Sequence, residues 1–306
     1  MTDDDSPNTP LIAITGATGK VGSLVARRLA GTVRLRLFSR DVERAEAAAR
    51  ALPRTTAAAE ASAAALDFAD QPGAVRALEG VDVVLMVSAE EASDRLAQHA
   101  AFIRAARAAG VGQIVYTSFF AAAPDAVFTL ARDHFATEKL LADSGVPHTI
   151  LRDNFYQDVF PLFAGDDHLL RGPAAEGRVS AVARDDVAAV AAVVLAEAAV
   201  AWAAGREPVH AGHTYDLTGP EAFDLHQAAA VMTEVTGVQT RYLHETVAEA
   251  LASRDGLGAP DWQMDAWIST YTAIASGELE PVSADVERLL GRPAQSLRRT
   301  LERLQD

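Results

Sequence analysis

The segment LIAITGATGKVG at residues 11–22 constrains the fold more than any other part of the chain. An apolar run is followed by three glycines at intervals of three residues and then by an amphipathic, helix-like stretch. Gly16 suits a tight turn, Gly19 lets a pyrophosphate approach the backbone, and Gly22 lets the helix pack close to the strand. Unpaired N–H groups at the start of the helix would bind the phosphates. We therefore expect a dinucleotide-binding loop made of Gly16, Thr18, Gly19, Lys20, Val21 and Gly22.

Short apolar runs alternate with amphipathic, alanine-rich segments from residue 11 to about residue 151. This alternation is typical of βαβ units that build a parallel sheet. Strands are expected at residues 11–15, 33–39, 64–67, 81–87, 113–117 and 148–151. Helices are expected between them, at residues 20–29, 41–51, 71–78, 93–109 and 129–143. The expected fold class is α/β, a Rossmann-type doubly wound parallel sheet with a smaller α+β C-terminal substrate region.

The regular alternation ends after Leu151. Helices are expected in this half at residues 155–163, 223–236 and 261–276, and strands at residues 214–217 and near 240–244. The expected organisation is a disordered tail at residues 1–10, a dinucleotide-binding domain at 11–153 and a mainly substrate-capping region at 154–306. Parts of residues 178–218 are expected to return to the Rossmann core.

The composition excludes several classes of partner and site. A formal net charge of −15 at pH 7 repels phosphate backbones, so no nucleic-acid partner is expected. The chain contains no cysteine, which excludes a disulfide framework and a thiolate metal site. His210 and His213 are the one close histidine pair, and no carboxylate partner is evident in the sequence, so no metal site is expected.

Two segments bear on where the protein works. The acidic start MTDDDSPNTP has no apolar core and is not expected to act as a secretory signal. The apolar run at residues 187–204 is interrupted by Glu197, so we expect a buried helix capped by Asp185 or Asp186 rather than a membrane span. A soluble, cytoplasmic protein without a membrane partner is therefore expected, and a homodimer is compatible with the sequence.

The end of the second expected strand discriminates between two dinucleotides. An arginine there can bind the 2′-phosphate of NADP, whereas an acidic side chain would bind the ribose hydroxyls of NAD. Arg40 stands at this end and Asp41 is expected to cap the next helix, so NADP(H) is preferred over NAD(H). The alternative is that Arg40 is a surface residue and Asp41 binds the ribose. Two further strands are expected to end at Asp67-Phe68 and at Val87-Ser88. These ends either line the same crevice or form ordinary turns.

Seven segments carry a family resemblance: TGATGKVGSLVARRL, LFSRD, QIVYTSF, HFATEKLLADSGVPHTILRDNFY, SAVARDDVAAV, TYDLTGPEA and GELEPVSADVERLLGRP. Together they resemble the NmrA-like, atypical short-chain dehydrogenase/reductase family, and within it the NADPH-dependent quinone oxidoreductases of type 2. The resemblance runs from about residue 10 to about residue 301 and implies a cleft over the nicotinamide. The family contains both reductases and non-enzymatic dinucleotide sensors that act through a protein partner, so fold does not decide function.

Typical short-chain dehydrogenases place a proton-donating tyrosine four residues before a lysine and beside a serine at a strand end. Here Lys139 matches the lysine and Ser118 matches the serine, but Phe135 replaces the tyrosine. A simple ketone needs a proton as its alkoxide forms, and a general acid supplies about 10² to 10⁴ in rate. A quinone spreads its developing charge over a conjugated system, so the missing phenol favours an activated acceptor.

Lys139 is expected to hold the nicotinamide ribose or to stabilise an oxyanion near Ser118, although a plain surface lysine is the alternative. His134 is a substitute acid by its ordinary pKa, but its spacing from Glu138 suits a helix-surface pair equally well.

The residues after the fifth and sixth expected strands, together with two C-terminal tryptophans, are the candidate substrate contacts. Tyr156 can hydrogen-bond an acceptor carbonyl, or it is simply a half-buried aromatic. The candidate substrate residues are Phe119, Phe120, Asn154, Phe155, Tyr156, Trp262 and Trp267. The resemblance implies that residues 154–156 lie around the nicotinamide and the substrate. The four aromatic residues at 119, 120, 262 and 267 either form an apolar wall or pack in the core, which is the ordinary role of each alone. The candidate catalytic residues are Lys139, Ser118 and Tyr156.

The expected function is hydride transfer from NADPH to a quinone or another conjugated carbonyl compound, with a small aromatic or quinone-like substrate. One alternative is a non-catalytic sensor of NADP(H) that acts through a protein partner. Another is a pathway-specific reductase or isomerase of a natural product.

Overall fold

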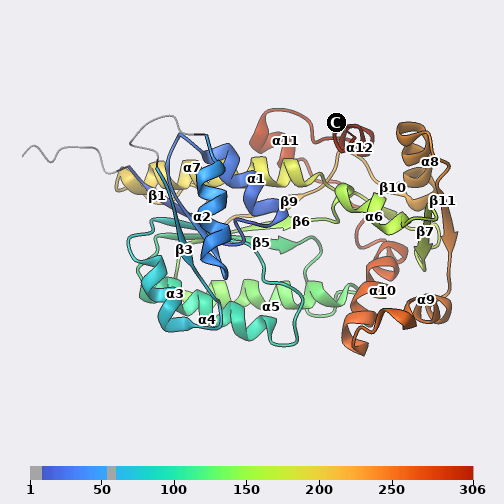
Figure 1. The fold of residues 1–306 in the computed structure, drawn as a ribbon, viewed down its shortest axis with the longest axis horizontal. Coiled ribbons are helices and arrows are strands. Elements are labelled where there is room, and N and C mark those ends of the chain that lie inside the picture. Colours follow the sequence, from blue (N-terminus) through green and yellow to red (C-terminus); the bar gives the residue numbers. More distant parts are fainter. Residues whose placement is uncertain (1–8, 54–59, 306) are drawn as a thin grey trace, which may run out of the picture. The chain divides into compact units, whose positions relative to one another are not determined.

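The computed structural model of the chain describes residues 9–53 and 60–305 (Figure 1). A disordered tail was expected at residues 1–10, of which residues 1–8 lie outside the described residues. The chain folds into two compact units. The first consists of the described residues up to Thr117 together with Ala136–Leu151 and Ala188–Tyr215. The second consists of Ser118–Phe135, Arg152–Val187 and the described residues from Asp216 onward.

A seven-stranded sheet with the order β3-β2-β1-β4-β5-β6-β9 is the main sheet of the fold. The strands are β1 (Leu11–Ile14), β2 (Arg34–Ser39), β3 (Ala61–Ala65), β4 (Val83–Met86), β5 (Gln113–Phe119), β6 (His148–Asp153) and β9 (Thr214–Leu217). Ile12 of β1 pairs in parallel with Leu35 on one side and with Val83 on the other. Every residue of β1, β4 and β5 is buried, as expected for strands covered on both faces. The predicted Rossmann-type α/β fold is confirmed.

Helices cover both faces of this sheet. Figure 1 shows α3 (Gln71–Leu78), α4 (Arg95–Ala108) and α5 (Thr129–Ser144) on one face and α1 (Lys20–Leu29) and α7 (Arg184–Ala203) on the other. The remaining helix of the first unit, α2 (Val42–Ala51), connects β2 to β3. Five of these helices match the expected ranges to within about two residues at each end.

Two expectations about the first unit are corrected. Strand β3 begins at Ala61 rather than residue 64, because the register pairs Ala61 with Leu35 and ends at Ser39 opposite Ala65. Helix α7 begins at Arg184, so Asp185 and Asp186 lie in its first turn and are not its cap.

Helix α7 is long and apolar enough to span a membrane, with a mean hydropathy of 1.8 in its most apolar 18-residue window. However, 67% of that window is buried inside the protein. Helix α7 is therefore packed as a core helix.

The second unit combines short strands with small helices. Strand β11 (Arg241–His244) pairs in parallel with β7 (Leu169–Gly172), and β10 (Phe223–Asp224) pairs antiparallel with β8 (Arg178–Val179). Its helices are α6 (Phe160–Ala164), α8 (Leu225–Thr236), α9 (Val247–Arg254), α10 (Asp261–Ser276), α11 (Asp285–Leu290) and α12 (Leu297–Arg303). The helix at 261–276 is confirmed, with Pro260 before it and the left-handed Gly277 after it. The helix expected at 155–163 is instead a 3₁₀ turn at Gln157–Val159 followed by α6.

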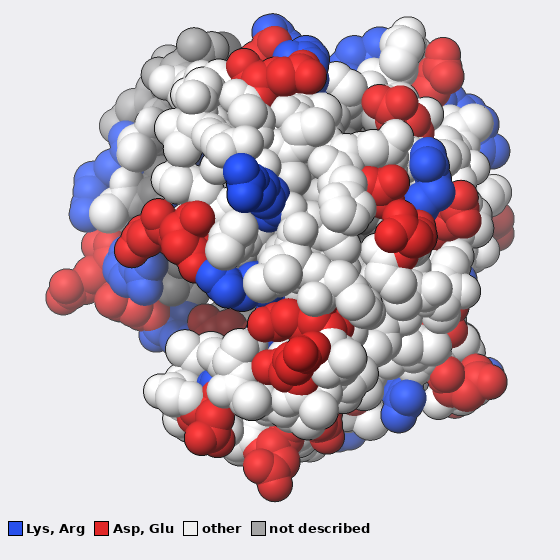
Figure 2. Space-filling view, turned by 90° about the vertical axis from the view of Figure 1, so that its right-hand side faces the viewer, with Lys and Arg blue, Asp and Glu red and all other residues white. Residues whose placement is uncertain are grey.

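The surface carries charge of both signs. Figure 2 shows one face on which basic side chains stand singly or in small groups among acidic and uncharged ones. Interspersed charges of this kind are typical of a solvated surface.

Candidate functional site

The glycine-rich segment forms a tight loop between β1 and α1. Gly16 has a φ of 58°, and the Gly19 N–H donates to the Gly16 carbonyl at 2.8 Å. Helix α1 starts directly after Gly19, with no side chain capping its first N–H groups and no acidic residue in its first turn. These N–H groups and the positive end of the helix dipole therefore point at an anion site.

Gly22 sets how closely α1 approaches the loop. A Cβ atom placed there would lie 2.3 Å from the carbonyl oxygen of Gly16 and 3.1 Å from that of Thr15. The helix can pack against the loop in this way only because residue 22 has no side chain.

The loop borders a cavity of about 500 Å³ within the first unit, which is a typical volume for a ligand pocket. The cavity lies at the carboxyl ends of β1, β2 and β4 and at the segment that follows β3, where open α/β sheets bind ligands. Eight predicted cofactor residues line it: Gly16, Thr18, Gly19, Arg40, Asp67, Phe68, Val87 and Ser88. Four others do not: Lys20 and Lys139 are exposed, on α1 and α5, and Val21 and Gly22 are buried in the first turn of α1.

The charged residues at the end of β2 have distinct partners. Asp41 caps α2, because its Oδ1 accepts from the N–H groups of Glu43 and Arg44. This expectation is confirmed. The Arg40 guanidinium forms an ion pair with Glu90 at 2.8 Å, and the two side chains are 70% and 82% exposed. Both residues line the cavity. The Arg40 guanidinium therefore lies at the cavity rim, in an ion pair with Glu90 that solvent screens strongly.

A buried polar network supports the wall formed by residues 87–89. Arg95 donates to the Ser88 hydroxyl, and the Ala89 N–H donates to Nε2 of His99 at 3.0 Å. Because that nitrogen accepts, Nδ1 carries the proton and donates to the Thr137 hydroxyl at 2.8 Å. Burial, and then the positive charge of Arg95, lower the pKa of His99 to about 3. His99 is thus neutral at physiological pH, which preserves its hydrogen bond to the Ala89 N–H, and no local pattern in the sequence indicated this role.

The carboxyl ends of β5 and β6 and the residues that follow them belong to the second unit. The rings of Phe119, Phe128 and Phe155 contact one another with centroids 4.7 to 5.3 Å apart. His134 is 8% exposed with its ring 6.2 Å from that of Phe119, so it is a buried residue and not a surface one. Phe120 joins the same core cluster.

Other predicted substrate residues have structural roles or lie elsewhere. Asn154 is 1% exposed and donates to the Ser180 hydroxyl and the Leu279 carbonyl, which argues against the predicted substrate contact. Trp267 packs in a separate cluster with Ala250, Met264 and Ile268, and Trp262 is 38% exposed. The structure therefore does not join the two tryptophans to Phe119 and Phe120 in one apolar wall.

The candidate catalytic residues are found in three different settings. Ser118 is fully buried in β5, Lys139 is exposed on α5, and Phe135 is half-buried on the same helix. Tyr156 is half-buried and donates a hydrogen bond to the carboxylate of Asp153. The roles of Ser118 and Lys139 stay predictions.

The histidine pair has a carboxylate neighbour that the sequence did not reveal. His210 contacts Glu197 of α7 at 2.9 Å and the Tyr215 hydroxyl at 2.8 Å, whereas His213 stacks on the ring of Tyr215. Among the described residues, no group of three or more potential ligands could hold a metal ion.

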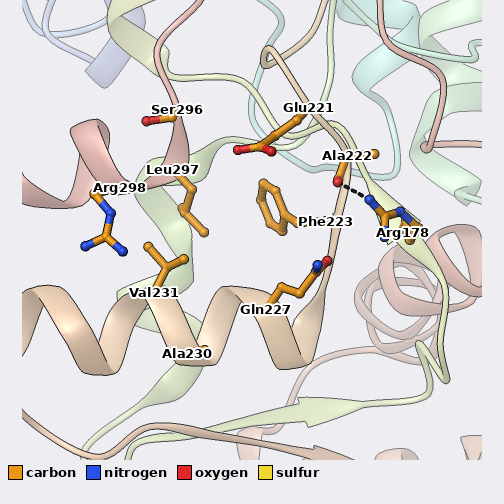
Figure 3. Close-up of a pocket in the computed structure, with 10 residues that line it drawn as sticks. All are labelled: Arg178, Glu221, Ala222, Phe223, Gln227, Ala230, Val231, Ser296, Leu297 and Arg298. Atoms are coloured by element: carbon orange, nitrogen blue, oxygen red, sulfur yellow. Dashed lines mark hydrogen bonds between the residues drawn. The ribbon is translucent and has the colours of Figure 1, made fainter.

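A second cavity, of about 460 Å³, lies in the second unit (Figure 3). Figure 3 shows Phe223, Leu297 and Val231 turned toward one another at its centre. The two arginines that line it are already engaged: Arg178 donates to the Ala222 carbonyl and Arg298 pairs with Glu234. None of the predicted substrate residues lines this cavity.

The chain is similar to several known oxidoreductases over nearly its whole length. A family model described as NAD(P)H-binding matches residues 16–198. Quinone oxidoreductase 2 of Escherichia coli (strain K12) is 34% identical over 297 residues, which are 96% of this chain and 98% of that protein. The NAD(P)H azoreductase of Xenophilus azovorans is 29% identical over 94% of this chain and 95% of its own length.

The structural comparison agrees with these similarities. The crystal structure of the E. coli NADPH-dependent quinone oxidoreductase in complex with NADPH has a TM-score of 0.83 and 32% identity, and covers 96% of this chain and 100% of that one. The chain therefore belongs to the NAD(P)H-binding family, as an oxidoreductase related to quinone oxidoreductase 2.

Proposed function

We propose that the protein is an NADPH-dependent reductase that transfers hydride to quinones or other conjugated carbonyl compounds. The observation that carries the proposal is the cavity of the first unit, which combines an uncapped helix start with an arginine at its rim. Support for the acceptor class comes from the similarity to a quinone oxidoreductase and an azoreductase over more than nine tenths of the chain.

The residues of the cavity fit this cofactor. The uncapped N–H groups at the start of α1 would hold the pyrophosphate, and Arg40 would hold the 2′-phosphate that distinguishes NADPH from NADH. Residues Asp67, Phe68, Val87 and Ser88 would line the rest of the nucleotide. When bound, NADPH supplies the hydride, and the buried Arg95–His99 network keeps the wall beside it in place.

The absence of a phenol at residue 135 supports the acceptor class. Phe135 offers no proton to a developing alkoxide, so simple ketones would lack the general acid that their reduction requires. We expect purified protein with NADPH to reduce small quinones and to leave aliphatic ketones unchanged. Ketone turnover comparable to quinone turnover would contradict this reasoning, and no turnover with any acceptor would leave a dinucleotide sensor as the better reading.

Arg40→Ala is expected to weaken NADPH binding about tenfold, or about 1.4 kcal/mol, because a charged hydrogen bond to the 2′-phosphate is lost. NADH lacks that phosphate, so its dissociation constant should stay within about twofold of the wild-type value. Isothermal calorimetry with both nucleotides measures the difference. Glu90→Gln should act in the opposite direction, because it removes the carboxylate that pairs with Arg40.

Arg50→Ala is the matched control for these two variants, since Arg50 is also an exposed arginine of the same region but pairs with Glu46 on α2 and does not line the cavity. An equal loss of NADH and NADPH affinity in Arg40→Ala would show that Arg40 does not read the 2′-phosphate.

Lys139→Ala is expected to lower kcat with a quinone by about tenfold, because the ammonium would hold the nicotinamide ribose or stabilise an oxyanion. The side chain is exposed, so the melting temperature should not change. Steady-state kinetics with saturating NADPH give the result. Asp143→Ala removes another exposed charge of α5 and should leave kcat unchanged. If Lys139→Ala turned over at the wild-type rate, Lys139 would be a plain surface lysine without a role in catalysis.

A cytoplasmic location is a further proposal from the sequence, and a homodimer is compatible with the sequence. Size-exclusion chromatography with light scattering measures the oligomeric state directly.

A further inference from the structure

Residues 87–89, directly after β4, form one wall of the cofactor cavity. We call these three residues the β4 wall. The wall adjoins the glycine-rich loop, because a Cβ atom placed at Gly16 would lie 3.3 Å from the Val87 Cβ atom. A nucleotide bound at the loop therefore meets the β4 wall as well.

The first two N–H groups of the β4 wall donate to threonine side chains. The Val87 N–H donates at 2.8 Å to the hydroxyl of Thr15, the residue that follows β1. The Ser88 N–H donates to the Thr117 hydroxyl of β5 at 3.0 Å. Both threonines are buried, so these two hydrogen bonds are shielded from water.

Helix α4 supplies the acceptor for the third N–H group. The Ala89 N–H donates to Nε2 of His99 at 3.0 Å, and Nδ1 of the same ring donates to the Thr137 hydroxyl at 2.8 Å. The side chains of His99 and Thr137 are fully buried. Burial, and then the positive charge of Arg95, lower the pKa of His99 to about 3, so Nε2 keeps the lone pair that accepts this bond.

The directions of these N–H groups determine the directions of the carbonyl groups. No described peptide bond is cis, and in a trans peptide the C=O of one residue points opposite to the N–H of the next. The Val87 carbonyl therefore points away from Thr117, and the Ser88 carbonyl points away from His99. Val87 and Ser88 line the cavity, whereas Thr117 and His99 do not. The β4 wall thus turns carbonyl oxygens toward the cavity, and these can only accept hydrogen bonds.

We propose that His99 is a positioning residue for cofactor binding, which holds the β4 wall so that the Ser88 carbonyl accepts a hydrogen bond from NADPH. The ribose hydroxyls and amide group of a dinucleotide are donors of the required kind. Its anionic groups would bind elsewhere in the cavity, at the start of α1 and at Arg40. The proposal rests on the proposed NADPH-dependent function and assigns a role to a buried residue that does not itself line the cavity.

Two amide substitutions at residue 99 separate the hydrogen bond to Ala89 from the one to Thr137. His99→Asn keeps a donor near the place of Nδ1 but has no atom near the place of Nε2, so it cannot reach the Ala89 N–H. His99→Gln carries its Oε1 oxygen near the place of Nε2 and can accept from that N–H. The dissociation constant of NADPH should rise about tenfold in His99→Asn and stay within about threefold of the wild-type value in His99→Gln. Calorimetry measures both values, and circular dichroism checks that both variants are folded.

Steady-state kinetics with a quinone show where the effect acts. In His99→Asn the KM for NADPH should rise while kcat keeps its wild-type value, because the β4 wall would bind the cofactor and not the acceptor. His148→Asn is the matched control, since His148 is a half-buried histidine of β6 whose Nδ1 contacts the Val146 carbonyl. Its NADPH affinity should stay within about twofold of the wild-type value.

Nuclear magnetic resonance of the wild-type protein without cofactor tests the hydrogen bond directly. The N–H···N bond should give a scalar coupling between the Ala89 nitrogen and Nε2 of His99, with the ring proton on Nδ1 at neutral pH. Absence of this coupling, or equal NADPH affinities of His99→Asn and His99→Gln, overturns the positioning role alone. Absence of NADPH binding by the wild type overturns the proposed function and the positioning role with it.

Discussion

Gly22→Ala is expected to weaken NADPH binding by about 100-fold, or about 2.7 kcal/mol. The new methyl group would lie 2.3 Å from the Gly16 oxygen and 2.8 Å from its carbonyl carbon. These are backbone atoms that cannot rotate away, so α1 must move off the loop and carry its uncapped N–H groups with it. Calorimetry with NADPH measures the loss of affinity.

Gly256→Ala is the matched control for this substitution. A Cβ atom at Gly256 would meet no heavy atom of the described residues within 4 Å, so NADPH affinity and stability should stay at wild-type values. Binding within about twofold of the wild type in Gly22→Ala would show that the phosphates are not held by the start of α1.

Asp186→Ala is expected to lower the free energy of unfolding by about 3 kcal/mol. The Asp186 side chain is fully buried and accepts hydrogen bonds from the Arg292 guanidinium, the Gln295 N–H and the Gln295 amide. Its removal leaves the partly buried Gln295 N–H without an acceptor and frees the segment that precedes α12. Thermal unfolding should show a fall in Tm of roughly 8 °C.

Asp265→Ala is the control for this loss of stability, because Asp265 is an exposed aspartate on α10. Its effect should stay within about 0.5 kcal/mol. Similar Tm values for the two variants would mean that the hydrogen bonds of Asp186 contribute little to folding.

The cofactor half of the site could be predicted because its signals are local. The loop at Gly16–Gly22, the cap at Asp41 and the position of Arg40 each depend on a few consecutive residues and on one strand-to-helix turn. The helix at 261–276 was predictable for a similar reason, since a proline and a glycine mark its two ends.

The substrate half was harder because its contacts join residues far apart in the chain. Trp267 packs in a separate cluster, and Asn154 donates hydrogen bonds to Ser180 and Leu279. No local pattern in the sequence indicates either contact. Strand β8 was missed because two residues are too few for a period to be read. Strand β7 was missed too: its sequence LLRG does not alternate between apolar and polar residues.

Two pairs of interacting residues in the first unit could not be predicted from the sequence. Arg95 and His99 are four residues apart on α4, a spacing that places both on one helix face, yet nothing in the sequence shows that this face is buried. Glu197 and His210 come from a helix and a later loop, so only the fold brings them together.

Hydride transfer from deuterated NADPH to a quinone is the most direct test of the central claim. Purified protein without added flavin should oxidise one NADPH per hydroquinone formed, and NADPH labelled at the transferred position of its nicotinamide should react more slowly, with a primary isotope effect on kcat/KM. Tight NADPH binding with no oxidation above the rate seen without protein would contradict the account and would identify the chain as a dinucleotide sensor.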